Sequence, residues 1–512
     1  MPLDPWLDGV HDAEGMRAAD RWAIEDQGIS SLELMEAAGR AVARASAELA
    51  GDGPVRVVCG KGNNGGDGLV AARALAETGF KAEALLLWPP DELSDDSRAN
   101  LERLEGGARH VEADAVAGAL EGSGVVVDAI FGTGFSGEPR APADAAIEAI
   151  NACDAAVVAA DVASGVDAST GEVAGAAIDA DITVSFHAAK LGHWIAPGKR
   201  HAGELQIAEI GIPPGAPAPA GAGLIAPAVL ELAPRRGGES TKFSSGQVLV
   251  VGGSRGLTGA VCMAAAASIR AGAGYATVAV PADLERIFEV KLTEVMSRGF
   301  SAAGGRLGSS DADAILDAAR GAAAVVLGPG LGRDEDSFAL ARELARRIEA
   351  PLLIDADGLN ALAGRLDELA EREHPTVLTP HAGELGRLLD RDSGEVDARR
   401  LASAREAAET SGAVVVLKGD DTLVVDGDRV AINRVDAPAL ATAGTGDVLS
   451  GTVGALLARG MDPYAAACAA VLAHARAGRE AASRLGAVES VIASDVIEAL
   501  PAGLRAQATD SI

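Results

Sequence analysis

Short, wholly apolar segments recur along the chain, and each gives way to glycine or a polar residue before a helical stretch begins. Segments apolar at every position suit strands buried on both faces, and their alternation with helices is typical of parallel sheets covered by helices on both sides. The sequence therefore predicts an α/β fold. The expected strands are residues 55–60, 81–88, 124–132, 155–162 and 181–186, then 247–254, 276–281, 323–330, 351–357, 376–381 and 413–419.

A stretch rich in proline, alanine and glycine, IPPGAPAPAGAG at 212–223, interrupts this alternation. Such a composition without periodicity is typical of a semi-rigid linker. We expect two domains, residues 1–212 and 224–512, joined by a linker at 213–223, and each is long enough to bury its own core. Because ligands of open parallel sheets bind beside the carboxyl ends of the strands, site residues are expected at those ends.

Composition narrows the classes of partner. The 512 residues include 44 basic and 74 acidic side chains, a formal net charge of −30, and only 3% are aromatic. A field of this sign repels phosphate backbones and anionic lipid, so we expect no nucleic acid and no membrane partner. The four cysteines form no C-x-x-C pair, and no apolar run has the length of a membrane span. These features predict a cytoplasmic protein.

The first glycine-rich loop, CGKGNNGGDG at 59–68, follows one expected strand and opens a helix. Glycine lets the backbone approach a ligand, and a helix N-terminus offers free N–H groups to a phosphate. The loop formally matches G-x-G-x-x-G, but acidic residues follow the next strand only after two prolines, so ordinary NAD binding is disfavoured. Asn63, Asn64 and Asp67 add side-chain oxygens where bare glycine would suffice.

Oxygen-bearing side chains stand at three strand ends of the first half. They are Asn64, Asp128 and the pair Asp161 and Ser164. Oxygen-only donor sets suit hard cations rather than zinc, so the sequence indicates a candidate cation site. The alternative is that each aspartate caps a helix or a turn.

The most specific motif of the second half is ATAGTGDVLSG at 441–451, in which a Gly-Thr-Gly run opens a helix. Backbone N–H groups of Gly444, Thr445 and Gly446 would form an anion hole for a transferring phosphoryl group. Asp447, in the first turn, would be the base that accepts a proton from an attacking hydroxyl. The alternative is an acidic residue that only complements the helix dipole.

Two further strand ends carry His381 and Lys418, and glycine loops occur at 250–260 and 328–333. A single strand-end histidine is as often a structural residue as a functional one. The segment SFHAAKLGHW places His187 and His193 on either side of Lys190, and no role for these three residues follows from the sequence.

These motifs together resemble those of the bifunctional NAD(P)H-hydrate repair enzymes. The resemblance implies an N-terminal Rossmann-like epimerase domain and a C-terminal ribokinase-like dehydratase domain. The first would interconvert the two epimers of hydrated NADH or NADPH, and the second would dehydrate the S epimer with ADP or ATP. The motifs that carry it, in family order, are GNNGGDG, DAIFGTGFSG, DVASGVD, TGAVCMAAAASIRAGAGY, GPGLG, DADGLNAL, LTPHAGE and AGTGDVLSG.

The resemblance also implies the residues of both sites. Asp161 and Asp447 would be catalytic, a potassium ion would be held by Asn64, Asp128 and Ser164, and Mg²⁺ would accompany the nucleotide. The epimerase substrate would contact Asn63, Asn64, Gly65, Gly66, Asp67, Gly132, Thr133, Gly134, Phe135, Ser136, Gly137, Glu138 and Asp161. The dehydratase substrate would contact Ala260, Gly330, Gly332, His381 and Asp447. The nucleotide would contact Lys418, Gly419, Asp420, Asp421, Thr422, Gly444, Thr445 and Gly446.

Two alternatives remain at this point. The second domain could be a small-molecule kinase of the same fold, which would accumulate a phosphorylated alcohol instead of releasing phosphate. The first domain could be a non-catalytic binding module, because a fold alone does not fix a function. The resemblance further implies a homo-oligomer, and the sequence does not distinguish ADP from ATP as the nucleotide.

Overall fold

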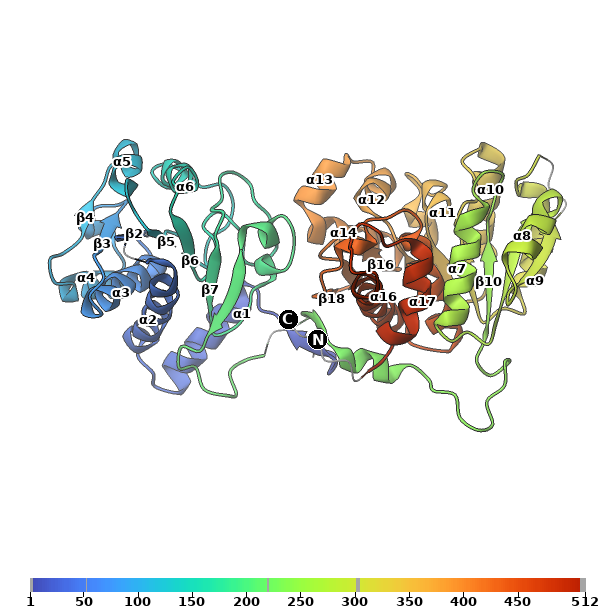
Figure 1. The fold of residues 1–512 in the computed structure, drawn as a ribbon, viewed down its shortest axis with the longest axis horizontal. Coiled ribbons are helices and arrows are strands. Elements are labelled where there is room, and N and C mark those ends of the chain that lie inside the picture. Colours follow the sequence, from blue (N-terminus) through green and yellow to red (C-terminus); the bar gives the residue numbers. More distant parts are fainter. Residues whose placement is uncertain (1–2, 52, 219–220, 301–303, 507–512) are drawn as a thin grey trace. The chain divides into compact units, whose positions relative to one another are not determined.

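The computed structural model describes residues 3–51, 53–218, 221–300 and 304–506. The chain divides into two compact units, one of Gly9–Ala222 and one that joins Met1–Asp8 to Gly223–Ile512 (Figure 1). The expected boundary at 212 assigned the first eight residues to the first domain, and this was wrong because β1 (Leu7–Gly9) pairs with β9 (Ala222–Ile225) in the sheet of the second unit. Strand β9 also begins inside the expected linker, whose residues 219–220 lie outside the described residues.

The described part of the first unit contains a seven-stranded sheet in the order β4-β3-β2-β5-β6-β7-β8, and every neighbouring pair is parallel. Each expected strand of this half is present, whereas the edge strands β4 and β8 were not expected. The strands are β2 (Val55–Cys59), β3 (Ala82–Leu86), β4 (Arg109–His110), β5 (Val125–Ala129), β6 (Ala156–Ala160), β7 (Ile182–Phe186) and β8 (Glu204–Ala208).

Alternate residues of the central strands face two different cores. Val57 of β2 packs in the core that contains α2 and α3, and its neighbour Val58 packs in the core that contains α5 and α6. This two-sided burial explains why the strands are apolar throughout. The helices are α1 (Ala13–Arg21), α2 (Ser31–Leu49), α3 (Asn63–Glu77), α4 (Asp95–Arg103), α5 (Val116–Leu120) and α6 (Ala143–Asn151).

The described part of the second unit contains an eleven-stranded sheet in the order β1-β9-β18-β17-β16-β15-β14-β13-β10-β11-β12. The strands from β16 to β12 are parallel, as expected, and β17 and β18 add an antiparallel hairpin around Gly427. The other strands are β10 (Gln247–Val251), β11 (Tyr275–Pro281), β12 (Met296–Phe300), β13 (Ala324–Leu327), β14 (Leu352–Ile354), β15 (Thr376–Leu378), β16 (Val414–Leu417), β17 (Leu423–Asp426) and β18 (Arg429–Ile432).

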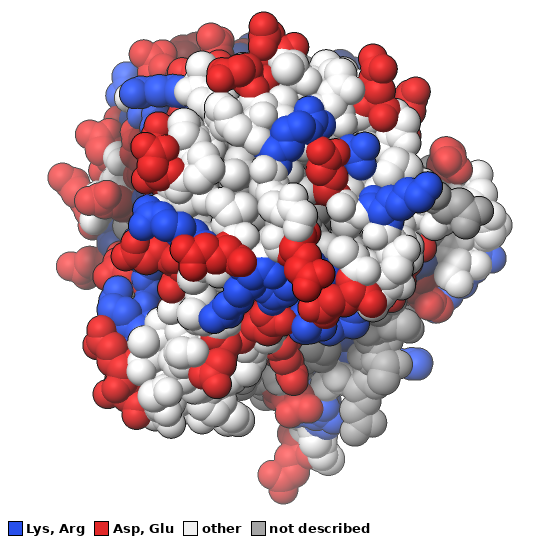
Figure 2. All heavy atoms as spheres, turned by 90° about the vertical axis from the view of Figure 1, so that its left-hand side faces the viewer, with Lys and Arg blue, Asp and Glu red and all other residues white. Residues whose placement is uncertain are grey.

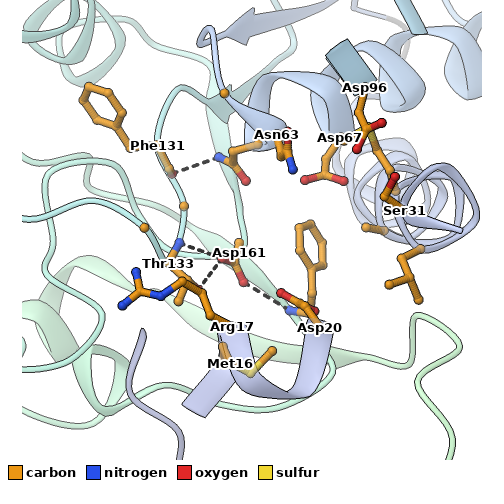
Figure 3. Close-up of a pocket in the computed structure, with 18 of the residues that line it drawn as sticks. Met16, Arg17, Asp20, Ser31, Asn63, Asp67, Asp96, Phe131, Thr133 and Asp161 are labelled. Atoms are coloured by element: carbon orange, nitrogen blue, oxygen red, sulfur yellow. Dashed lines mark hydrogen bonds between the residues drawn. The ribbon is translucent and has the colours of Figure 1, made fainter. Parts of the chain in front are cut away.

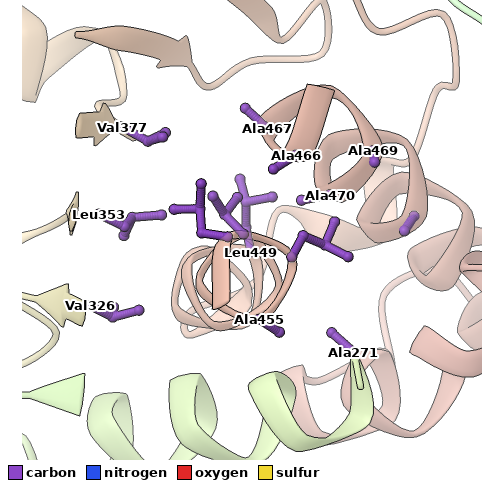
Figure 4. Close-up of a cluster of buried hydrophobic side chains, with 14 of the residues drawn as sticks. Ala271, Val326, Leu353, Val377, Leu449, Ala455, Ala466, Ala467, Ala469 and Ala470 are labelled. Carbon is purple, nitrogen blue, oxygen red and sulfur yellow. The ribbon is translucent and has the colours of Figure 1, made fainter. Parts of the chain in front are cut away.

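Two helices, α15 (Thr445–Ala458) and the alanine-rich α16 (Pro463–Leu485), lie against this sheet. Leu449 of α15 points toward Val326, Leu353 and Val377 of three neighbouring strands in the same core (Figure 4). The remaining helices of the unit are α7 (Thr258–Arg270), α8 (Glu285–Lys291), α9 (Ala312–Ala319), α10 (Glu335–Arg347), α11 (Asp357–Asn360), α12 (Ala382–Leu389), α13 (Ser393–Ala398), α14 (Arg400–Ser411) and α17 (Ala493–Gly503).

The surface reflects the acidic composition. On the face drawn in Figure 2, acidic side chains lie around the rim and across the middle with basic side chains beside them, and areas without charged side chains lie between. Within the described ranges, no helix is long and apolar enough to cross a membrane.

Gly451 of α15 provides a test of this packing. A Cβ atom there would lie 2.0 Å from the carbonyl oxygen of Ala264 on α7, so the two helices would have to separate. We expect Gly451→Ala to lower the free energy of unfolding of the second unit by about 1–3 kcal/mol, measured by denaturant unfolding. Gly394→Ala on α13, where a Cβ meets nothing within 4 Å, is the matched control and should leave stability unchanged or slightly raised. Equal effects of the two changes would contradict this account of the packing.

Candidate active sites

The first unit holds a cavity of about 660 Å³ beside the carboxyl ends of its central strands. Its walls come from α1, from the loop that opens α3, from the loop after β5, and from Asp161 after β6 (Figure 3). Two glycines bring these loops together. A Cβ on Gly60 would lie 2.0 Å from the oxygen of Ile130, and one on Gly65 would lie 1.9 Å from the oxygen of Gly60. These two glycines are therefore needed because the loop backbones pack in direct contact at these positions.

The expected epimerase residues divide into two groups around this cavity. The residues of the expected set that do not line it are Gly65, Gly66, Gly137 and Glu138. Those that line it are Asn63, Asn64, Asp67, Gly132, Thr133, Gly134, Phe135, Ser136 and Asp161.

The three residues expected to hold a cation meet at the peptide of Phe131. The Asn64 amide donates to the Phe131 carbonyl at 2.8 Å, and the Phe131 N–H donates to the Ser164 hydroxyl at 2.8 Å. That hydroxyl donates in turn to Asp128 at 2.7 Å. Residues from three loops therefore bring carboxylate, hydroxyl, amide and carbonyl oxygens to one place.

Asp128 is completely buried, and burial raises its pKa to about 6 although Ser164 and the Ile130 N–H donate to it. No ion pair to Asp128 occurs within the described ranges. A buried carboxyl group without a positive partner, surrounded by neutral oxygens, has the donor chemistry of a hard-cation site. The residues present therefore fit such a cation.

Asp161 is the most heavily engaged carboxylate of the cavity. One oxygen accepts from the Thr133 N–H at 2.8 Å and from the Thr133 hydroxyl at 2.5 Å, and the other accepts from the Lys190 ammonium at 2.5 Å (Figure 3 shows Thr133 and Asp161). Burial opposes ionisation, but the Lys190 charge and these hydrogen bonds hold the pKa of Asp161 below its ordinary value. Asp161 is therefore a fixed anion, and its backbone adopts a positive φ of 69°.

Lys190 is a site residue to which the sequence analysis gave no role. Its side chain is fully buried, and its ammonium also donates to the Ser185 hydroxyl and the Phe186 carbonyl, each at 2.9 Å. His193 accepts from the Lys190 N–H through Nδ1, so its Nε2 carries the hydrogen and donates to the Asp161 carbonyl at 3.1 Å. Burial lowers the pKa of His193 to about 3, so the ring is neutral.

The second unit gathers its polar residues at the carboxyl ends of β14, β15 and β16. The Lys418 ammonium lies 3.0 Å from Asp355 and 3.6 Å from Glu384, and a Cβ on Gly446 would lie 3.7 Å from its nitrogen. Lys418 thus stands beside the first turn of α15, as its expected role requires. Asp355, which lies in the motif DADGLNAL and was not expected as a site residue, also accepts a hydrogen bond from Ser450 of α15 at 2.6 Å.

Asp447 has no hydrogen-bond or ion-pair partner among the residues that the structure describes. Burial and then the negative charge of Asp355 raise its pKa to about 7, although Lys418 opposes the shift. A carboxyl group with this pKa can accept a proton near neutral pH.

His381 and Asp421 have structural contacts. His381 caps α12, because its Nδ1 accepts from the N–H groups of Gly383 and Glu384. Asp421 is buried in an ion pair with Arg400, whose Nε donates to it at 2.9 Å, and Arg400 also donates to the Lys418 carbonyl. The side chain of Asp421 therefore supports the loop after β16 from inside.

Hydroxyl groups of the expected nucleotide site are also engaged locally. Thr422 donates to the Gly419 carbonyl at 2.6 Å, and Thr445 donates to the Leu440 carbonyl at 2.7 Å. Of the backbone N–H groups expected to form an anion hole, that of Thr445 donates to the Thr442 carbonyl at 3.4 Å, whereas those of Gly444 and Gly446 have no partner among the described residues.

Of the other expected dehydratase residues, Ala260 lies on α7, and Gly330 and Gly332 lie in the loop after β13. A Cβ on Gly330 would lie 3.3 Å from the Cβ of Ala260, and one on Gly444 would lie 2.5 Å from Met263. Ala260 and Met263 are one helical turn apart, so α7 links the 328–333 loop to the N-terminus of α15. Gly332 donates to Asp357 at 3.1 Å.

The structure is thus that of a two-unit α/β protein, with a cavity at the strand ends of one unit and a glycine-rich helix N-terminus beside a lysine in the other. Family models match residues 31–192, described as YjeF-related protein N-terminus, and residues 248–502, described as NAD(P)H-hydrate dehydratase. Relatives named bifunctional NAD(P)H-hydrate repair enzyme Nnr include that of Salinibacter ruber, 39% identical over 96% of this chain and 95% of its own length. The chain belongs to the family of bifunctional NAD(P)H-hydrate repair enzymes.

Other relatives extend this match. The Moorella thermoacetica enzyme of the same name is 39% identical over 96% of each chain, and that of Escherichia coli is 32% identical over 97% of this chain and 94% of its own. A solved structure titled ADP/ATP-dependent NAD(P)H-hydrate dehydratase from Bacillus subtilis, co-crystallized with ATP/Mg²⁺, is 28% identical with a TM-score of 0.47. It covers 54% of this chain and 94% of that one.

The Lys190–Asp161 pair provides a test of the first site. Lys190→Met leaves a buried carboxylate without its counter-charge, so we expect the first unit to lose about 3–5 kcal/mol of stability, measured by denaturant unfolding. Adding Asp161→Asn should recover part of that loss, because the unpaired charge is removed. Lys81→Met, at an exposed position, is the control and should change stability by less than about 0.5 kcal/mol. A Lys190→Met effect as small as the control would show that the pair is not coupled.

Proposed function

We propose that this chain repairs hydrated NADH and NADPH, as the names of its relatives imply. Unit Gly9–Ala222 would interconvert the two epimers of the hydrate, and the second unit would dehydrate the S epimer with ADP or ATP. The single observation that carries the proposal is Asp447, a half-buried carboxyl group that has no partner among the described residues and lies in the first turn of a helix that opens with Gly-Thr-Gly.

The chemistry of the second unit follows from the hydroxyl group that hydration adds to the nicotinamide ring. Asp447 would accept the proton of that hydroxyl while its oxygen attacks the terminal phosphorus of the nucleotide. Backbone N–H groups of Gly444, Thr445 and Gly446 would hold the moving phosphoryl group, and Lys418 would balance its charge. The new phosphate ester is a good leaving group, so its departure with loss of a ring proton restores the double bond.

We assign the nucleotide to the loop of residues 418–422, whose backbone is fixed from within by the Arg400–Asp421 pair and by Thr422. Within the described ranges, no group of three or more His, Cys, Asp and Glu side chains could hold a metal ion. Mg²⁺ would therefore be held largely by the phosphates of the nucleotide, where it neutralises charge on the transferring group. The use of ADP or ATP, and a homo-oligomeric assembly, stay predictions.

In the first unit the hydrate would occupy the cavity lined by Asn63, Asp67 and Thr133, with Asp161 as a catalytic residue. A potassium ion would be held by Asn64, Asp128 and Ser164, and its positive charge would fix these three loops and attract the phosphates of the substrate. Burial raises the pKa of Asp67 well above its ordinary value, and in its protonated form Asp67 would donate a hydrogen bond to the substrate.

One experiment tests both activities. A mixture of both hydrate epimers is incubated with potassium and with ADP or ATP, and products are followed by chromatography and by the return of NADH absorbance. We expect both epimers to disappear, with phosphate released as NADH is restored. Accumulation of a stable phosphorylated product would indicate a kinase, and persistence of one epimer would indicate that the first unit does not epimerise.

Asp447→Asn tests the proposed base. We expect the dehydration rate to fall by about 10²–10⁴-fold, because the amide cannot accept a proton. In the parent enzyme kcat/KM should rise with pH through about 7, since only the ionised carboxylate acts as a base, and this rise should be absent in the variant. Asp317→Asn, at an exposed position of α9, is the control. A parent-like rate in Asp447→Asn would contradict the role of Asp447.

Asp128→Asn tests the cation site. Epimerisation by the parent enzyme should be faster in potassium chloride than in choline chloride of equal ionic strength, and potassium should raise the unfolding midpoint of the first unit. Both responses should be lost in Asp128→Asn and kept in the exposed control Asp114→Asn, whereas dehydration of the S epimer should be unaffected. An unchanged potassium response in Asp128→Asn would contradict the assignment.

A further inference from the structure

Four carboxyl groups from four different elements reach the cavity of the first unit. They are Asp20 on α1, Asp67 on α3, Asp96 on α4 and Asp161 after β6 (Figure 3). Asp161 alone has a hydrogen-bond or ion-pair partner for its side chain among the described residues. The other three carboxyl groups are left for a ligand.

The contacts of Asp161 make it a poor carrier of protons. Both of its oxygens already accept hydrogen bonds, and protonation would break the 2.5 Å ion pair with the fully buried Lys190. Its pKa lies below the ordinary value in spite of burial, because Lys190 and Thr133 stabilise the carboxylate. Asp161 is therefore suited to stabilise positive charge and not to exchange a proton with the substrate.

Asp20 has the opposite environment. It is the last residue but one of α1 and projects into the cavity close to Asp161, and none of the described residues donates a hydrogen bond to its carboxyl group (Figure 3). Burial, followed by the negative charge of Asp161, raises its pKa to about 6, and Lys190 opposes the shift. Two carboxyl groups of one pocket with their pKa values displaced in opposite directions are typical of a division into a charged group and a proton carrier.

We propose that Asp20 is a catalytic residue of the epimerase cavity and that it exchanges a proton with the hydroxyl group of the hydrate. This inference rests on the proposed epimerisation. It assigns the fixed negative charge to Asp161 and the mobile proton to Asp20.

The chemistry of the hydrate fits this division. Hydration of an enamine places the hydroxyl on the carbon bonded to the ring nitrogen, because protonation of the far carbon produces an iminium ion to which water adds. Asp20 gives its proton to the hydroxyl oxygen, the C–O bond breaks as the nitrogen lone pair forms a C=N bond, and water leaves. Water then adds to the other face of the ring and returns a proton to Asp20. The Asp161 carboxylate stabilises the iminium ion between the two steps.

The charge state of Asp20 depends on groups from several elements. Arg17 belongs to the same helix and Lys61 to the loop before α3, and both line the cavity. The remaining titratable groups that face the cavity or act on these carboxyls are Asp67, Asp96, Asp161 and Lys190. Because the protonated form of Asp20 begins the reaction, the epimerisation rate should fall as pH rises above about 6.

The test uses the full chain, one purified epimer of hydrated NADH and potassium. Nucleotide is left out because the proposed dehydration requires it, so only epimerisation can proceed. Interconversion is followed by chromatography in water enriched in ¹⁸O. The parent enzyme should convert one epimer into the other with about one solvent oxygen gained per conversion. Asp20→Asn should slow interconversion by about 100-fold or more and lose the pH dependence, and Asp20→Glu, which keeps a carboxyl group, should recover part of the rate.

Two controls separate this role from a loss of folding. Glu14→Gln, on the exposed face of the same helix, should behave like the parent, and Asp20→Asn should dehydrate the S epimer normally when nucleotide is supplied. A parent-like rate and pH profile in Asp20→Asn, or retention of the original oxygen in the product, would overturn the inference. Failure of the parent enzyme to interconvert the epimers would instead overturn the proposed epimerisation.

Discussion

Close approach of loop backbones at the carboxyl ends of the strands is the constraint on which both sites depend. A Cβ on Gly60 would lie 2.0 Å from the Ile130 carbonyl, and one on Gly328 would lie 1.9 Å from the Asp355 carbonyl. Neither distance leaves room for any side chain, so glycine alone allows adjacent loops to touch. In the first unit this contact brings Asn64 within hydrogen-bond distance of Phe131. In the second unit it places the glycine loop after β13 against the backbone of Asp355, and the Asp355 side chain accepts a hydrogen bond from Lys418.

Within this frame each site contains one lysine that fixes the charge of its neighbours. Lys190 is fully buried and holds Asp161 as an anion, whereas Lys418 is shared by Asp355 and Glu384 at the N-terminus of α15. Two other acids, Asp20 and Asp447, have no such partner among the described residues, and their pKa values are raised to about 6 and about 7. In both units a fixed carboxylate thus lies near one that can exchange a proton close to neutral pH.

Much of this architecture could be predicted from the sequence, because strands buried on both faces are apolar throughout and glycine loops mark their ends. Asn64, Asp128 and Ser164 were expected to lie together because parallel strands end on one edge, and the hydrogen bonds through Phe131 agree with that reasoning. The pairing of β1 with β9 was missed because a three-residue strand has no detectable period and its partner is more than 200 residues away.

Lys190 and Asp20 were missed for a different reason. Lys190 reaches Asp161 across 29 residues of sequence, and no local spacing indicates that contact. Asp20 lies in an amphipathic helix, where an acidic residue is ordinarily a solvated one, and only the fold turns it toward a cavity. Asp421 was expected to contact the nucleotide, but its side chain is buried in an ion pair with Arg400 of α14. Because Arg400 precedes it by 21 residues, no local sequence pattern indicates this pairing.

The central claim is that a phosphoryl group is transferred at the first turn of α15. A crystal structure of the full chain with a non-hydrolysable nucleotide and a reduced dinucleotide tests it most directly. The account predicts the terminal phosphate within hydrogen-bond distance of the N–H groups of residues 444–446, with the Asp447 carboxylate facing the nicotinamide ring. A terminal phosphate bound away from that turn, or Asp447 turned into an unrelated contact, would contradict it.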